Sequence, residues 1–447
     1  MNQHQAKNHR WYVNALFARI DRRYSLAIGG HRGFSTIVLC GCSWLRSGIN
    51  GDLNFSRAAI LLLASLFTKP VNAIVGDAIR PFVEVSYAHD NNLLRLSPIQ
   101  LNGGNGADST KTLDTGILLD KSFGRQHISG NVKFSRTRFE KFTGLDNDAK
   151  DIQASWNWQV GNHLEGNVGS QYKQGLAPFS ELRSNVRDVK TQKNSFLDAK
   201  LRLKPSWSLH AGVTRQSLSY DLPTQQIGNR IEDAQEVGLD YLPSSGSSVG
   251  GVFRRTRAAY PVQQQLGALV VANSYRQNDV KLKVDWILSS KSRLQFLGGV
   301  VQREYDVFQS RNKTAPSVRV TGNWQPTSKI NMVLSGYHEI SPSDDLTINY
   351  SVVSGVSLSS SWDLLTKVRL DALLRRENRD FNAASAFSAS LPFNRVEKSR
   401  FGSLQLTWSP KQDLQLTASL FRDDLYSTVA QRAYRAAGAV VGLRAAF

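Results

Sequence analysis

The residue types that most often carry catalysis or hold metal ions show no catalytic spacing in the main part of the chain. After residue 73, no two histidines are four positions apart. Both cysteines, Cys40 and Cys42, precede that point, and no P-loop is present. The sequence therefore predicts no enzyme, no metal site and no cofactor. The histidines in question are His89, His127, His163, His210 and His338.

Charged residues instead alternate with apolar ones over short segments. The segment 279–288 reads DVKLKVDWIL, and segments 151–160 (DIQASWNWQV) and 364–374 (LLTKVRLDALL) show similar alternation. Successive side chains of a β-strand point to opposite faces, so a period of two predicts a strand with one apolar and one polar face. No segment after residue 73 shows a convincing helical period.

The strands end in a recurring way. An aromatic residue is followed by Pro or Gly with Ser, Thr or Lys, and then a new alternation begins, as in WSPKQDLQL. Matching hairpins lie about 40 residues apart, with a short turn on one side and a longer polar loop on the other. The aromatic residues at these strand ends are Trp158, Tyr241, Trp286, Trp324, Trp362 and Trp408.

Short turns, long loops and aromatic strand ends together predict a transmembrane antiparallel β-barrel of about 18 strands, of the bacterial outer-membrane type. The aromatic residues would form the periplasmic girdle at the lipid headgroups. A soluble β-sandwich or β-propeller is the alternative fold. A propeller also repeats about every 40 residues, but each blade needs four strands and these repeats hold two.

The segment VVGLRAAF at the C-terminus continues the alternation through Val441, Leu443, Ala445 and Phe447. We expect a closing strand with one lipid-facing side, paired with the first strand, RPFVEVSYAH. Phe447 would be the girdle aromatic of that strand. A terminal aromatic also resembles the C-terminal signature that the barrel assembly machinery recognises.

A leader is expected over residues 1–73, followed by the barrel over 74–447. Residues 58–67 read AAILLLASLF, which suits the hydrophobic region of a secretory signal peptide and is too short to span a membrane. We expect cleavage after Ala73. Three alternatives stay open: a short buried helix at 58–67, a lipoprotein-like box at LCGC, and a true start codon downstream of Met1.

If the apolar set faces lipid, the other set lines the lumen, and a barrel of about 18 strands can enclose an aqueous channel. The formal net charge is +19, but the expected lining carries both signs. The alternative is that these charges only solvate the wall and pair across strands. The residues expected to line the lumen are Lys200, Arg202, Lys281, Lys283, Asp285, Arg319, Lys367, Arg369 and Asp371.

The first expected strand carries a family resemblance. Residues 78–98 read AIRPFVEVSYAHDNNLLRLSP, and the matching positions are Arg80, Pro81, Phe82, Tyr87, Asp90, Asn91, Asn92, Leu93 and Arg95. This segment resembles outer-membrane proteins of exopolysaccharide biosynthesis operons, the EpsL type associated with exosortase systems. His89 stands where the family pattern leads us to expect Asp. HDNN could bind a cation, although a turn is the alternative interpretation.

The resemblance implies export of an extracellular polysaccharide across the cell outer membrane, and it identifies no catalytic residue. The alternative is a general or substrate-specific porin for small solutes, and a third class is a structural or enzymatic barrel without transport. Expected partners are outer-membrane lipid and lipopolysaccharide, a polysaccharide substrate, the barrel assembly machinery and periplasmic export components. Nucleic acid is excluded. A loop folded into the lumen would favour a porin, and segments 186–192 and 261–277 are the candidates.

Overall fold

A computed structural model describes residues 78–266, 269–271, 273–307, 309, 312–345, 348–381 and 395–447. The expected leader, its hydrophobic segment 58–67 and the cleavage point after Ala73 lie outside the described residues. All elements below belong to one compact unit of the chain. None of the helices in the described part is long and apolar enough to cross a membrane.

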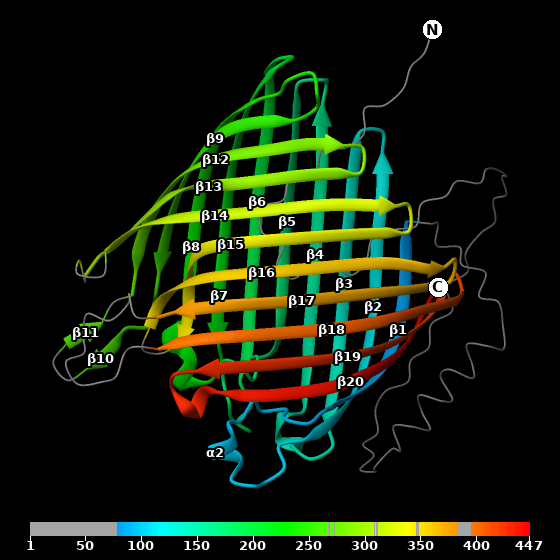
Figure 1. Cartoon of the computed structure of the whole chain (residues 1–447), viewed down its shortest axis with the longest axis vertical. Helices are drawn as coiled ribbons and strands as arrows, with labels where there is room; N and C mark the ends of the chain where they lie inside the picture. The colour runs from blue at the N-terminus through cyan, green and yellow to red at the C-terminus, as the bar shows by residue number, and fades with distance from the viewer. Residues whose placement is uncertain are drawn as a thin grey trace, which may run out of the picture. The chain divides into compact units, whose positions relative to one another are not determined.

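The alternating segments form one 18-stranded antiparallel sheet that closes on itself (Figure 1). Each strand pairs with the next along the chain, β9 pairs with β12, and β1 pairs with β20. Closure pairs the backbone of the edge strands, as a hydrocarbon environment requires. The barrel strands are β1 (Ile79–Asp90), β2 (Asp108–Phe123), β3 (Gln126–Phe139), β4 (Asn147–Val160), β5 (Leu164–Leu176), β6 (Val189–Lys204), β7 (Trp207–Tyr220), β8 (Arg230–Tyr241), β9 (Ser248–Ala259), β12 (Tyr275–Ser289), β13 (Ser292–Tyr305), β14 (Lys313–Thr327), β15 (Ile330–Asp345), β16 (Ile348–Leu365), β17 (Val368–Asp380), β18 (Val396–Lys411), β19 (Leu414–Ser427) and β20 (Tyr434–Ala446).

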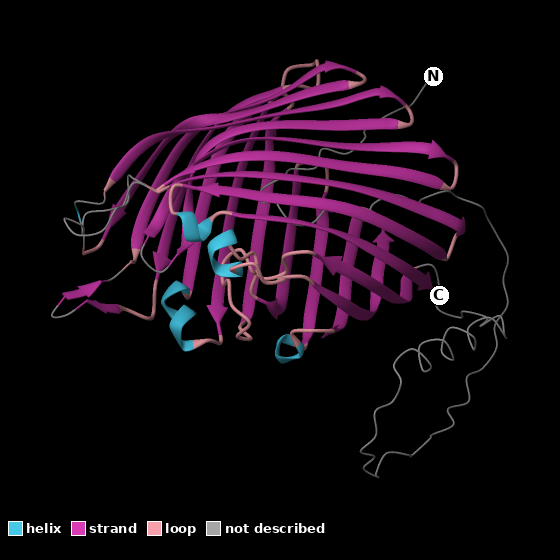
Figure 2. Cartoon of the chain, turned by 60° about the horizontal axis from the view of Figure 1, so that its bottom comes forward, coloured by secondary structure: helices cyan, strands magenta, loops and turns pink. Residues whose placement is uncertain are grey.

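The two ends of the barrel differ. At the turn end, short connections join β2 to β3, β4 to β5 and the later even–odd pairs, and Gly124 and Gly161 adopt positive φ angles of 57° and 59° in two of these turns. At the loop end, the connections carry α2 (Pro98–Leu101), η1 (Thr143–Leu145), η2 (Pro223–Gly228) and η5 (Ala430–Arg432). Figure 2 shows these short helices at one opening of the barrel.

The strand count and the closure agree with the sequence prediction. β1 pairs with β20 from Phe82 opposite Ala446 to Asp90 opposite Gly438, and the Phe447 N–H donates to the Pro81 carbonyl at 2.9 Å. The expected pairing of the last strand with the first is confirmed. A separate hairpin, β10 (Gln264–Leu266) with β11 (Leu269–Val271), lies in the connection from β9 to β12 and projects away from the barrel wall (Figure 1).

Candidate functional site

The wall has an apolar face and a polar face, which alternate along each strand. On β12, Val280, Leu282 and Trp286 are 63%, 49% and 53% exposed. The side chains between them are covered: Lys283 and Asp285 are 18% and 10% exposed. In water this exposure of large apolar side chains around the barrel would be costly, so the exposed apolar face is the outer, lipid-facing surface.

Most predicted lining residues lie on the polar face and form ion pairs there. Lys283 Nζ lies 3.1 Å from an Asp240 carboxylate oxygen, and the ring Nδ1 of His210 is 2.9 Å from the other oxygen. Lys281 pairs with Asp279 on its own strand at 3.3 Å. Their charges are therefore largely balanced by neighbours in the wall.

Four more of the predicted lining residues are also paired. Arg319 makes a two-pronged contact with Glu339, its Nε at 3.1 Å. Arg369 Nε lies 3.0 Å from Asp371, and Asp285 forms a two-pronged pair with Arg293. Lys200 is 8% exposed. Arg202 is exposed near the turn end of β6.

The prediction that Lys367 lies within a strand of the lining is wrong. β16 ends at Leu365 and β17 begins at Val368, so Thr366 and Lys367 form the turn between them. Lys367 Nζ donates to the Pro410 carbonyl near the end of β18 at 2.8 Å. The alternation continued through the two turn residues without a break, so the pattern alone hid the boundary.

The aromatic residues predicted for the girdle all lie at the turn end of their strands. Trp286 and Trp324 are each 53% exposed, and Phe447 is 37% exposed. Tyr241, Trp362 and Trp408 are also exposed, whereas Trp158 is half-buried against Gly166. Phe123 and Trp207 occupy the same level and were not predicted from the sequence. Both adjoin a two-residue turn, and that adjacency was the available signal. Trp207 lies 5.2 Å from Tyr241 between ring centroids.

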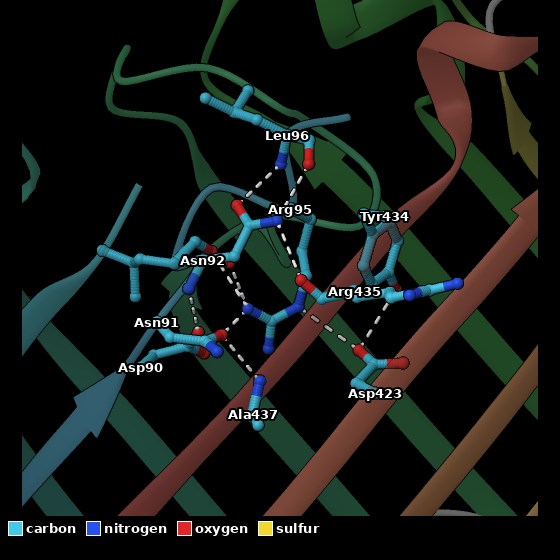
Figure 3. A network of polar contacts seen from close by, with 10 residues as sticks. Asp90, Asn91, Asn92, Arg95, Leu96, Asp423, Tyr434, Arg435 and Ala437 are labelled. Atoms are coloured by element: carbon cyan, nitrogen blue, oxygen red, sulfur yellow. Dashed lines mark hydrogen bonds and ion pairs between the residues drawn. The ribbon is translucent and has the colours of Figure 1, made fainter. Parts of the chain in front are cut away.

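The motif that carried the family resemblance builds a polar network at the loop end, where β1 meets β20 (Figure 3). Arg95 lies in its centre, in the left-handed region with φ of 57°. Arg95 Nη1 lies 2.7 Å from Asp90, and Arg95 Nε lies 3.3 Å from Asp423. Burial disfavours the charged guanidinium, but Asp90 outweighs this effect, and the pKa of Arg95 is raised.

The asparagines of the motif complete this network. The Asn92 side chain donates to the carbonyls of Leu96 at 2.8 Å and Arg435 at 3.1 Å, and its Oδ1 accepts from the Leu96 N–H. The Asn91 Oδ1 accepts from the Ala437 N–H at 2.8 Å. HDNN therefore forms a turn held by protein groups, and it links the first loop to β20.

Apolar packing joins three neighbouring loops at the same end. Leu94 from the β1–β2 loop and Leu145 from the β3–β4 loop are 4% and 0% exposed and form a cluster with Phe139. Phe142 and Phe179 pack against it, and Phe179 belongs to the β5–β6 loop. The loops are thus packed against one another at the mouth.

Arg183 of the β5–β6 loop reaches the β19–β20 loop. Its Nη1 donates to the carbonyls of Gln431, at 3.4 Å, and Arg432, and its guanidinium lies 5.0 Å from the Tyr434 ring centroid. Five strand spacings separate β20 from β5, about 24 Å along the wall at about 4.8 Å each. The β5–β6 loop therefore extends across part of the mouth. Burial, with the nearby Arg432 charge, lowers the pKa of Arg183 to about 10, so it stays charged at neutral pH.

A second cluster of buried side chains lies at the loop ends of the strands from β9 to β17. Phe381, which follows β17, packs with Tyr275 and Tyr305 in a buried cluster. Arg303 is 2% exposed, with its guanidinium 4.1 Å from the Tyr275 ring centroid and its Nε 2.8 Å from the Gln277 side-chain oxygen. Neither the Arg183 contact nor this cluster has a local sequence signal, because each joins loops and strands that are distant in the sequence.

The structure offers little to a catalytic interpretation. The pattern G-x-S-x-G occurs at Gly246–Gly250, but Ser248 there begins β9, whereas a nucleophile elbow needs a turn from a strand into a helix. Among the described residues, no group of three or more His, Cys, Asp or Glu side chains could hold a metal ion. The site that stands out is the mouth, with the charged wall beneath it.

A closed 18-stranded antiparallel barrel with an apolar outer face and an aromatic level at its turn end is a transmembrane β-barrel of the outer-membrane type, and the protein is located in the outer membrane. No family model and no curated protein sequence matches the chain.

Solved outer-membrane proteins are similar in fold. OccK2 (OpdF) of Pseudomonas aeruginosa is 11% identical with a TM-score of 0.46, and the match covers 83% of this chain and 98% of that one. OpdK of the same organism, solved with vanillate, is 12% identical with a TM-score of 0.45 over 83% and 99%. A BenF-like porin from Pseudomonas fluorescens Pf-5 is 9% identical with a TM-score of 0.45 over 83% and 99%. Strand pairing and exposure remain the evidence for the class given above.

Proposed function

We propose that this protein is a channel for small polar solutes across the outer membrane. The observation that carries the proposal is the loop contact across the mouth, in which Arg183 of the β5–β6 loop bonds to the β19–β20 loop. A loop held across an opening admits small molecules more readily than an extended polymer. Paired charges along the polar face suit a wetted wall that offers hydrogen bonds without a strong net field.

In this proposal, Lys200, Lys283, Arg319 and Arg369, with their acidic partners, line the lumen. Their ion pairs leave the charges partly balanced, so we expect weak selection by charge and stronger selection by size. The girdle of Trp286, Trp324 and the related aromatics would hold the turn end at the periplasmic headgroup level.

The test is solute passage through the purified full-length barrel in liposomes, using sugars from a monosaccharide to a tetrasaccharide. We expect passage that falls steeply with size. Arg183→Ala should widen the range, because it removes the loop contact across the mouth, whereas Arg187→Ala, an exposed charge change in the same loop, should not. Wild-type and Arg183→Ala liposomes that are both impermeable to the smallest sugar would contradict the channel proposal.

Export of an extracellular polysaccharide is the second candidate, and the resemblance over residues 78–98 favours it. A gene deletion and a transport measurement on the purified barrel together distinguish the two candidates. A deletion of the gene that abolishes polymer secretion, together with a purified barrel that passes no small sugar, would support export. Unchanged secretion after the deletion would remove this candidate.

A further inference from the structure

A groove crosses the outer face of the barrel from β3 to β9. Its volume is 1070 Å³. Large side chains on its rim include Trp156, Leu197 and Val213, which are 45%, 46% and 49% exposed. Between them the groove is lined by small residues, Ala154 and Ser195, and this lack of bulk forms the depression.

The strand register shows that the groove follows one row of outer-face residues. Each member lies directly opposite the next on the neighbouring strand, so the row runs perpendicular to the strands. Its apolar part ends at Val213 on β7, and its polar part ends at Arg255 on β9. The row is Ile128, Trp156, Val168, Leu197, Val213, Gln235 and Arg255.

This row climbs from the turn end toward the loop end. Ile128 lies two residues from the first residue of β3, at the turn end. Arg257, which also lines the groove, lies two residues from the last residue of β9, at the loop end. Strands of such barrels are tilted by about 35–45°, so a row perpendicular to them crosses the bilayer obliquely.

The loop end of the groove carries more cations than carboxylates, since Arg215, Arg255 and Arg257 line it together with Asp233. Arg257 lies directly opposite Asp233 on β8 and directly opposite Arg276 on β12, and like charges in the latter position destabilise a sheet. Asp233 forms an ion pair with Arg215 at 3.4 Å, and Asp306 forms an ion pair with Arg276 at 3.1 Å.

Arg255 and Arg257 are both exposed. In the described part of the chain, no carboxylate forms an ion pair with either of them. An anion at this position would relieve the repulsion between Arg257 and Arg276.

We propose that this outer groove binds lipopolysaccharide, with a lipid A phosphate on Arg255 and Arg257 and an acyl chain along the apolar part from Val213 toward Ile128. The long loops of outer-membrane barrels are extracellular, so the cationic end lies in the outer leaflet, where the anionic lipid is lipopolysaccharide. A phospholipid of the inner leaflet would place its phosphate at the opposite, apolar end.

The test is native mass spectrometry of the full barrel, refolded in detergent without lipid and titrated with lipid A. Arg255→Gln with Arg257→Gln should weaken binding roughly tenfold or more, as expected for losing charged hydrogen bonds to a phosphate. Ala154→Phe, which fills the groove and keeps every charge, should also weaken it. Lys398→Gln with Arg400→Gln makes the same charge change on the outer face of β18 and should leave binding near the wild-type value.

Three results would overturn the proposal. The β18 pair could weaken binding as much as the β9 pair, which would indicate attraction to the whole charged rim. Ala154→Phe could leave binding unchanged while heat-modifiable migration shows a folded barrel. Phosphatidylglycerol could bind as tightly as lipid A, which would make the groove a general lipid contact. Passage of sugars through the lumen does not enter this test, so the channel proposal stands or falls separately.

Discussion

Arg95 lies in the loop between β1 and β2 and links that loop to β19 and β20. It contacts Asp90 and Asp423, and the centre of its guanidinium lies 5.8 Å from the Tyr434 ring centroid. Its side chain is only 14% exposed, so removing it leaves two covered carboxylates without this partner. Breaking one side of a covered ion pair costs more than an exposed pair contributes.

Arg95→Ala should therefore release the β1–β2 loop from the mouth. We expect local opening of residues 91–107 to become easier by about 3 kcal/mol, in the range for a covered pair that loses one partner. Amide hydrogen exchange over this segment measures the effect. Arg125→Ala, at an exposed turn on the opposite end, is the control, and equal exchange in the two variants would show that Arg95 does not hold the loop.

The two faces of a strand should respond oppositely to the same new charge. Leu404→Lys places an ammonium on the lipid-facing side near the middle of β18, where it should cost about 2–4 kcal/mol. Ser403→Lys places it one residue away, on the polar face, and should be tolerated. Urea unfolding in detergent gives both values, and a similar loss for Ser403→Lys would contradict the assignment of faces.

Neighbouring strands lie close enough that single side chains determine their packing. The Trp158 ring on β4 covers Gly166 on β5, which lies directly opposite. A Cβ at Gly166 would lie 2.4 Å from that ring and 2.3 Å from the Asp198 carbonyl oxygen. This glycine lets the girdle aromatic lie flat against the wall.

Gly166→Ala should displace Trp158 and cost about 1–3 kcal/mol, as is usual for overpacking. Gly251→Ala is the matched control, because Gly251 also lies on the outer face and a Cβ there meets nothing within 4 Å. Heat-modifiable migration and urea midpoints would show the difference. If both variants unfold at the same urea concentration, the packing of Trp158 on Gly166 does not matter for stability.

Strands could be predicted from the sequence because alternation is a local property, readable over ten residues. Turn boundaries were less secure, and Lys367 shows why: Thr366 and Lys367 kept the alternation while the chain reversed. The mouth could not be predicted. Arg183 and Arg432 are 249 positions apart, and nothing in either loop's own sequence indicates their contact. The ion pairs of the wall were foreseen only as an alternative to a charged lining.

On the scale of the whole molecule, the barrel is one sheet closed by one seam. The seam joins β1 to β20, and the residue that follows β20, Phe447, still bonds to Pro81. Closure removes the free strand edges that would otherwise pair with other chains. Its location explains why apolar alternation continues to residue 447.

Deletion of Phe447 should lower the amount of assembled barrel in the outer membrane, with a smaller effect on the urea midpoint of the protein that does assemble. The side chain is 37% exposed, so its own burial contributes little, whereas a terminal aromatic resembles an assembly signal. Phe447→Tyr retains the ring and should assemble normally. Normal outer-membrane amounts after the deletion would exclude a role in assembly.

The position of the seam also concentrates the final pairing of the sheet in one strand. β20 pairs with β19 on one side and with β1 on the other, so it supplies the hydrogen-bonding partners of two strands that are distant in the sequence. A chain without β20 would keep β1 and β19 as two free strand edges, and free edges are available to pair with other chains. One strand therefore separates a closed barrel from an open sheet that is prone to association.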